Sequence, residues 1–213
     1  MEPDVDDTDK SMPDDPILRR VLSGSAYERE RLERFSHFKQ PIPKKLTVQG
    51  ILLGSLALLV PLYSLYPASS AQYLPSMDPV VASPKVVLLG TFGAAIEAGT
   101  ATLLVAAALY RVRYEPLTEG QAESVVNVET FASYLGFGTG TVCIVATFAF
   151  FLLGMGGGET LEWYVAAMDG VNPFTPTGMP FSVGHLGTAA LAGALVIAIA
   201  RGYVATRLSE IES

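Results

Sequence analysis

The sequence predicts an all-α integral membrane protein: a four-transmembrane-helix bundle with an N-terminal amphipathic interfacial helix. Two observations lead to this fold class. Four stretches each contain roughly 20 or more mostly apolar residues, enough for a helix to cross ~30 Å of hydrocarbon. Nearly all basic residues also fall on one side of these stretches. The predicted spans are residues 46–66, 86–110, 131–153 and 181–200.

Helices are the expected conformation of these spans because backbone polar groups find no water in the bilayer core and must be satisfied internally. Glu97 is the one charged residue within the four spans. A soluble protein with four buried apolar helices is a poor alternative, because a chain of 213 residues cannot supply enough amphipathic helix to cover them.

The distribution of Lys and Arg predicts the orientation. Of the 14 basic residues, nine lie in residues 1–45, and the two loops expected on the outside contain only Lys85. Positively charged loops stay in the cytoplasm, so we expect a multi-pass protein of the plasma membrane with both termini cytoplasmic. The first apolar run begins some 45 residues into the chain, so this span is expected to act as its own anchor without a cleaved signal peptide.

The region before the first span divides into two parts. Residues 1–15 hold seven acids and one Lys, out of a net charge of −7, and are predicted to be a disordered acidic cytoplasmic tail. Residues 16–45 are predicted to form cytoplasmic or interfacial amphipathic helices. The low isoelectric point and the acidic loops are compatible with a salt-adapted, archaeal (halophilic) source.

Within this region, Ser25 and Glu28 have the spacing of a capping box that opens a helix over residues 26–39. This helix is expected to lie in the headgroup layer, with a partner-binding helix as the alternative. Lys44 and Lys45 are expected to anchor the chain at the membrane interface.

The predicted transmembrane domain comprises residues 46–204 and is followed by a cytoplasmic tail over 205–213. Thr118 and Gln121 form a second capping-box pattern, so the third helix is expected to begin near Glu119 and to enter the membrane without a break. Its Gly136-xxx-Gly140 pattern lets a neighbouring backbone approach closely. On the outer side, residues 160–168 are expected to form a short surface helix, and the proline-rich residues 172–181 a stiff connector.

Glu97 is the principal candidate for a polar site, because a carboxylate at mid-membrane normally faces a bundle interior or a water-filled cavity. No Lys or Arg lies at its depth, so we expect a neutral acid that is hydrogen-bonded to a hydroxyl group. It serves either to join helices or to bind a proton or cation. The candidate hydroxyl groups are those of Ser55, Thr139 and Thr141. Thr100 is a further candidate, because it lies in a stripe of small residues on the same face of the second span as Glu97.

His185 is the other titratable candidate, but it is expected nearer the outer surface than Glu97, where an interfacial role is the alternative to a ligand. The lone Cys143 lies inside the third span and is expected to be a packing residue. No pattern of nucleotide, cofactor or metal binding is present, and no metal site is expected.

Three classes of function fit these observations. The first is a non-catalytic accessory or scaffold subunit of a membrane assembly, with a membrane-protein partner or a homo-oligomer in the bilayer and no nucleic-acid partner. The second is a small proton- or cation-coupled transporter or channel that uses Glu97. The third, an intramembrane enzyme, has least support, because no nucleophile with a base and no metal with a base can be assembled from these residues.

Overall fold

The computed structural model describes residues 25–33 and 38–212 and confirms the predicted fold class. The predicted acidic tail, residues 1–15, and the residues up to 24 lie outside the described part. Within the described part, four helical stretches are long and apolar enough to cross a membrane. The chain is therefore a polytopic helical membrane protein associated with a lipid bilayer.

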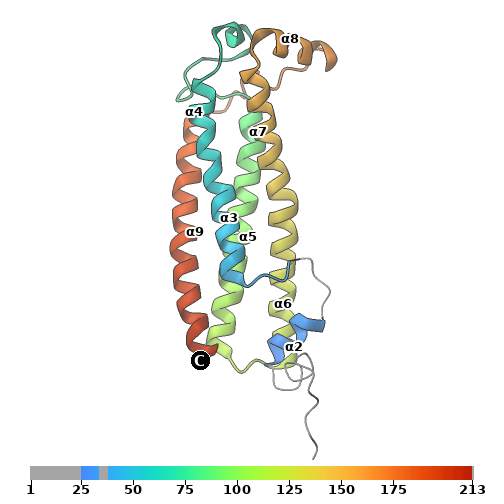
Figure 1. Cartoon of the computed structure of the whole chain (residues 1–213), viewed down its shortest axis with the longest axis vertical. Coiled ribbons are helices and arrows are strands. Elements are labelled where there is room, and N and C mark those ends of the chain that lie inside the picture. Colours follow the sequence, from blue (N-terminus) through green and yellow to red (C-terminus); the bar gives the residue numbers. More distant parts are fainter. Residues whose placement is uncertain (1–24, 34–37, 213) are drawn as a thin grey trace, which may run out of the picture.

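The four stretches lie side by side along the long axis of the molecule (Figure 1). Helix α5 contacts the other three stretches and is the central one. In chain order the stretches are α3 (Ile42–Ser55), η1 (Leu56–Leu58) and α4 (Leu59–Ser64); α5 (Val86–Tyr114); α6 (Glu119–Tyr134), η3 (Leu135–Gly140) and α7 (Thr141–Met155); and α9 (Val183–Glu212).

The ends of these helices follow from local sequence. Helix α6 begins at Glu119 with the predicted Thr118–Gln121 capping box and continues through η3 into α7, as predicted. Helix α3 begins at Ile42, before the predicted start at residue 46, because Pro41 occupies the N-cap and proline is tolerated in a first turn. Helix α9 continues past the predicted end at residue 200, because no proline stops it.

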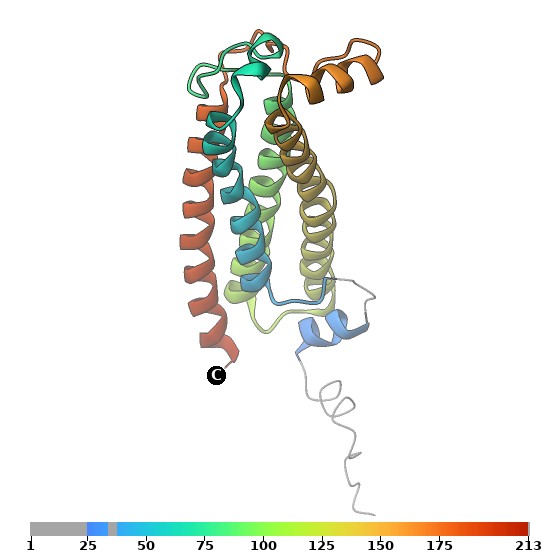
Figure 2. The same cartoon turned by 45° about the horizontal axis from the view of Figure 1, so that its top comes forward.

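At one end of the bundle the connection before α5 and the connection before α9 pair with each other and form a cap. The Lys85 amide donates to the Thr175 carbonyl at 2.8 Å, and the Thr177 amide donates to the Ser83 carbonyl at 2.9 Å. The predicted short surface helix is present as α8 (Gly157–Ala167), which projects sideways beside η2 (Ala68–Tyr73) (Figure 2). The proline-rich segments therefore connect to one another rather than lying independently.

An aromatic cluster closes the bundle beneath this cap. The rings of Tyr63, Tyr66, Phe151 and Phe174 are buried and contact one another. The Tyr66 hydroxyl donates to the Phe151 carbonyl at 2.8 Å, so its polar group is satisfied inside the apolar layer. This end of the bundle is thereby held by both backbone pairing and ring packing.

Helix α2 (Ala26–Glu33) packs against α6 at the opposite end, where α9 also ends (Figure 1). The Glu28 amide donates to the Ser25 hydroxyl at 3.4 Å, as the predicted capping box requires at this position. The described helix ends at Glu33, and residues 34–37 of the longer predicted helix lie outside the described residues. Helix α2 is therefore docked on the bundle through a specific contact with α6.

Candidate functional site

Glu97 lies on α5 in the interior of the bundle, with none of its surface exposed. Two elements face it: α3, which contributes Gln49, and the π-helical segment η3 of the third span. Neither carboxylate oxygen has a hydrogen-bond partner among the described residues. Thr141 and Gln49 lie beside the carboxylate, but each donates elsewhere: the Thr141 hydroxyl to the Gly136 carbonyl at 3.5 Å and Gln49 Nε2 to Thr100 Oγ1 at 2.8 Å. The bundle therefore encloses a carboxyl group to which neither neighbour makes a well-formed hydrogen bond.

Two glycines of η3 allow the helix backbone to approach this carboxyl group. A Cβ atom built on Gly140 would lie 2.8 Å from Glu97 Oε1. One built on Gly136 would lie 2.8 Å from Thr100 Oγ1 and 3.3 Å from Glu97 Oε2. Any larger residue at these two positions would press on the polar group. The Gly136-xxx-Gly140 pattern thus receives buried polar side chains. The predicted close approach of a neighbouring backbone occurs at Gly93 of α5, where an added Cβ atom would lie 3.2 Å from the Gly140 carbonyl oxygen. Single π-helical turns of this kind are frequent at functional sites.

The hydrogen bonds around Glu97 leave an excess of acceptors. Gln49 Nε2 donates to Thr100 Oγ1 at 2.8 Å, and that hydroxyl in turn donates to the Ile96 carbonyl at 2.8 Å. Gln49 Oε1 has no partner in the described part of the chain. Three acceptor oxygens, two from Glu97 and one from Gln49, are thus buried together without a donor. One hydrogen on the carboxyl group would supply the missing donor, so the neutral acid fits these surroundings better than the anion.

The structure brings together some of the sequence-predicted site residues and separates others. Thr100 lies beside Glu97 against Gly136, as the predicted stripe requires. Thr139 is exposed on the outer side of the bundle and does not contact the carboxyl group. Ser55 donates instead to the Leu52 carbonyl at 2.7 Å. Of the predicted hydroxyl groups, Thr141 is therefore the one adjacent to Glu97.

His185 is separate from this group. Its ring lies on the exposed side of α9, where Nδ1 accepts from the Ser182 amide at 3.2 Å and the ring stacks on Phe181. The adjacent Leu186 packs at Gly90, which is about two helical turns, ~10 Å, from Glu97 along α5. This position agrees with the depth expected from the sequence.

Gln49 was missed in the sequence analysis, which considered hydroxyl and charged partners for Glu97 but no amide. Gln49 is completely buried on α3 and contributes both a hydrogen bond and an unpartnered oxygen to the site. The sequence signal that could have identified Gln49 is a polar amide close to the start of an apolar span.

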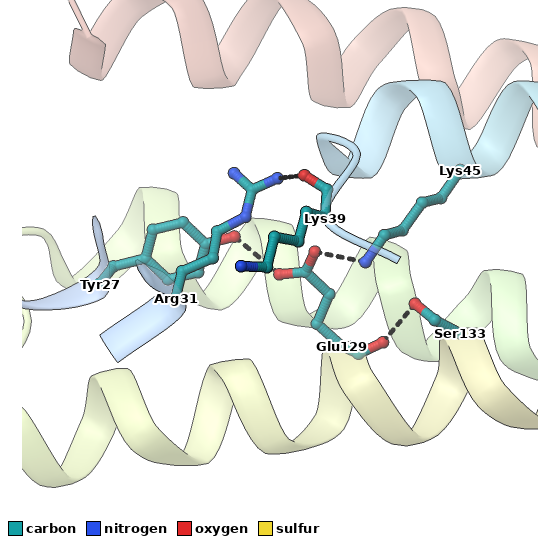
Figure 3. Close-up of polar contacts among 6 residues, drawn as sticks. All are labelled: Tyr27, Arg31, Lys39, Lys45, Glu129 and Ser133. Atoms are coloured by element: carbon teal, nitrogen blue, oxygen red, sulfur yellow. Dashed lines mark hydrogen bonds and ion pairs between the residues drawn. The ribbon is translucent and has the colours of Figure 1, made fainter. Parts of the chain in front are cut away.

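A second polar cluster lies where α2 docks on the bundle, and it is centred on Glu129 of α6 (Figure 3). Lys45 Nζ lies 2.7 Å from Glu129 Oε1, and the Tyr27 hydroxyl donates to Glu129 Oε2 at 2.7 Å. Lys45 is only 2% exposed. The prediction that Lys45 anchors the chain at the membrane interface is therefore wrong, because Glu129 supplies a buried counter-charge that draws the ammonium group inward.

Tyr27 joins this cluster to α5. The Arg111 guanidinium lies 4.2 Å from the centre of the Tyr27 ring, a cation–π distance. Burial, and then the negative charge of Glu129, raise the pKa of the Tyr27 phenol, so this group remains a hydrogen-bond donor at neutral pH. One tyrosine therefore holds α2 against both α6 and α5.

Comparisons of this chain with protein-family models, with curated proteins and with solved structures gave no match.

Proposed function

We propose that this chain is a non-catalytic subunit or scaffold of a larger membrane assembly and that it contacts its partner through the outward face of α5. One observation carries the proposal. At the middle of the span this face consists mostly of small side chains, and Leu103 is the large residue that lies between them. The exposed small residues are Ala95, Ala98, Gly99, Thr102 and Ala106.

The outward face of α9 provides the contrast within the same bundle. There large apolar side chains are exposed between small ones such as Ala192 and Ala198, as expected for a surface in contact with lipid: Leu191, Leu195, Val196 and Ile199. Lipid chains are as apolar as leucine, so helices associate in a bilayer mainly through close van der Waals packing. Small side chains permit that packing, which is why α5 is the better candidate for a protein contact.

The test is to purify the chain from its native membrane in mild detergent and to identify co-purified proteins by mass spectrometry. Gly99→Leu adds a large side chain to the proposed face, where a Cβ atom would meet nothing within 4 Å of this bundle. We expect it to reduce the recovered partner, or a second copy of the chain, by about tenfold, which corresponds to ~1.4 kcal/mol.

Ala198→Leu is the matched control, because Ala198 is an exposed small residue on the lipid-facing side of α9. It should leave partner recovery unchanged. A chain that remains a monomer without partners in mild detergent would contradict the proposal, and so would equal losses from Gly99→Leu and Ala198→Leu.

A second candidate function is proton- or cation-coupled transport, and the acceptor excess around Glu97 supports it. A buried acid that is neutral in this surrounding and anionic in another could carry a proton through a cycle of conformations. In proteoliposomes, Glu97→Gln should then abolish a pH- or cation-dependent flux while the folded bundle persists. The absence of flux in the wild type would remove this candidate.

We also propose that the end bearing α2 and the α9 terminus is cytoplasmic and that the membrane is the plasma membrane. The location of α2 and the end of α9 at the same end of the bundle supports this orientation (Figure 1). Labelling of single cysteines at Ser25 and Ser209 with an impermeant reagent tests it in intact cells. Protection of both sites is expected, and labelling of either from outside would contradict the orientation.

A further inference from the structure

A small cavity lies at the end of the bundle where α2 docks, between that helix, the start of α3, and the last turns of α5 and α9. Its volume is about 150 Å³. The polar groups that line it come from Tyr27, Arg31, Arg111 and Ser209, and its apolar walls include Ile42 and Leu208. No acidic residue is among the described residues that line it.

The charges around this cavity favour an anion. Arg31 and Arg111 approach it from α2 and α5, two elements that are distant in sequence. Arg31 also borders the neighbouring hollow that Lys39 lines, and its guanidinium donates to the Lys39 carbonyl. Three described acids lie near these residues: Glu129 is bound by Lys45 and Tyr27, Glu115 lies 3.6 Å from Arg111 and shares its charge, and Glu28 borders the neighbouring hollow beside Arg31. None of the three lines the cavity itself. Two guanidinium groups therefore converge on one small cavity.

The level of the cavity along the bundle identifies the source of the anion. Ile42 is the first residue of its membrane-spanning stretch, and Leu208 lies in the last turns of another. The ends of apolar spans are where lipid headgroups are expected to meet a membrane protein. Basic pockets between spans at the cytoplasmic level bind anionic headgroups, and guanidinium groups recognise phosphate through paired N–H donors. Apolar walls beside the charges suit the first carbons of the acyl chains.

We propose that this cavity binds the phosphate group of an anionic membrane lipid, with Arg31 and Arg111 as its charged ligands and the Ser209 hydroxyl as a further donor. The bound lipid would join α2 to α9, two elements that both line the cavity. This binding site is separate from both Glu97 and the outward face of α5, so it does not depend on the scaffold or transport role; the choice of an anionic lipid rests on the proposed cytoplasmic orientation.

The experiment uses the full-length chain in detergent, titrated with phosphatidylglycerol, with phosphatidylcholine and with inorganic phosphate. Binding is followed by native mass spectrometry and by thermal unfolding. Phosphatidylglycerol should bind and raise the unfolding temperature, whereas phosphatidylcholine should do neither. Arg31→Gln should weaken phosphatidylglycerol binding roughly ten- to a hundredfold, because it removes charge-assisted hydrogen bonds.

Two further variants make the result specific. Arg113→Gln is the control, because Arg113 is exposed near the same end of α5 but does not line the cavity. It should leave lipid binding unchanged. Ala205→Leu fills the cavity without a change in charge and should also weaken binding, which keeps the test valid if Arg31→Gln fails to fold.

Equal binding of phosphatidylcholine, or an equal effect of Arg113→Gln and Arg31→Gln, would overturn the proposal. Binding of inorganic phosphate alone, with the same dependence on Arg31, would assign the cavity to free phosphate and would overturn the lipid assignment.

Discussion

Glu97 and Glu129 are both buried in this bundle, yet their carboxyl groups meet opposite surroundings. Glu129 has a cationic partner and a phenolic donor, each 2.7 Å from one of its oxygens. Glu97 accepts no well-formed hydrogen bond from the described residues, and its neighbour Gln49 adds a further unpartnered acceptor. The two surroundings therefore favour different forms of the same side chain: the anion at Glu129 and the neutral acid at Glu97.

The positions of the two glutamates along the bundle explain the difference. Glu129 precedes Gly136 by about two helical turns, ~10 Å, and lies where the Tyr27 phenol of α2 and the Lys45 ammonium of α3 can reach it. At Glu97 the nearest elements supply an amide, hydroxyl groups and glycine backbone. A buried acid at the end of the bundle can thus serve as a docking point, whereas one at mid-depth keeps its capacity to bind a proton.

The largest expected effect comes from removing the charge of Glu129. Glu129→Gln leaves the Lys45 ammonium buried without an anion, which should destabilise the fold by ~3–5 kcal/mol. Unfolding in mixed detergent, monitored by circular dichroism, measures this loss. Glu123→Gln, an exposed position on the same helix, is the control and should change the stability little.

The double variant Lys45→Met with Glu129→Gln distinguishes a broken ion pair from general damage at this position. Removal of both charges eliminates the uncompensated ammonium group, so the double variant should recover most of the stability lost in Glu129→Gln. If Glu129→Gln were as stable as Glu123→Gln, the pairing of Lys45 with Glu129 would not hold in the membrane protein.

A smaller effect is expected at the glycines that face Glu97. Gly140→Ala places a methyl group 2.8 Å from Glu97 Oε1 and should cost ~1–3 kcal/mol through overpacking. Gly138→Ala, two residues away in the same π-helical segment, meets nothing within 4 Å and should be neutral or slightly stabilising. The difference between their unfolding temperatures measures how closely η3 encloses the carboxyl group. Equal effects would mean that the enclosure is loose.

Apolar periodicity and capping patterns are local properties, and the sequence was sufficient for the elements that depend on them. The four spans, the start of α6 at Glu119 and the α8 surface helix all follow from the residues that form them. Glu97 was likewise identifiable, because a charge within an apolar span stands out without any knowledge of its neighbours.

Contacts between distant segments were not predictable in the same way. Lys45 was assigned to the interface because its partner, Glu129, is 84 residues away and lies before the predicted third span. Thr139 was a candidate neighbour of Glu97, but the phase of the helix through η3 turns this residue outward and brings Thr141 and Gly140 inward. The rotation of the third span about its own axis thus decides which hydroxyl group lies beside the carboxyl group.

The smallest effect on stability is expected at Glu97 itself. In Glu97→Gln the new amide provides N–H donors next to the unpartnered Gln49 Oε1, so the free energy of unfolding should remain within about 1 kcal/mol of the wild type. The wild type should also show the infrared carbonyl band of a protonated carboxylic acid, and this band should disappear in Glu97→Gln. A large loss of stability together with no such band would mean that Glu97 is ionised and holds a cation, which reverses the contrast with Glu129.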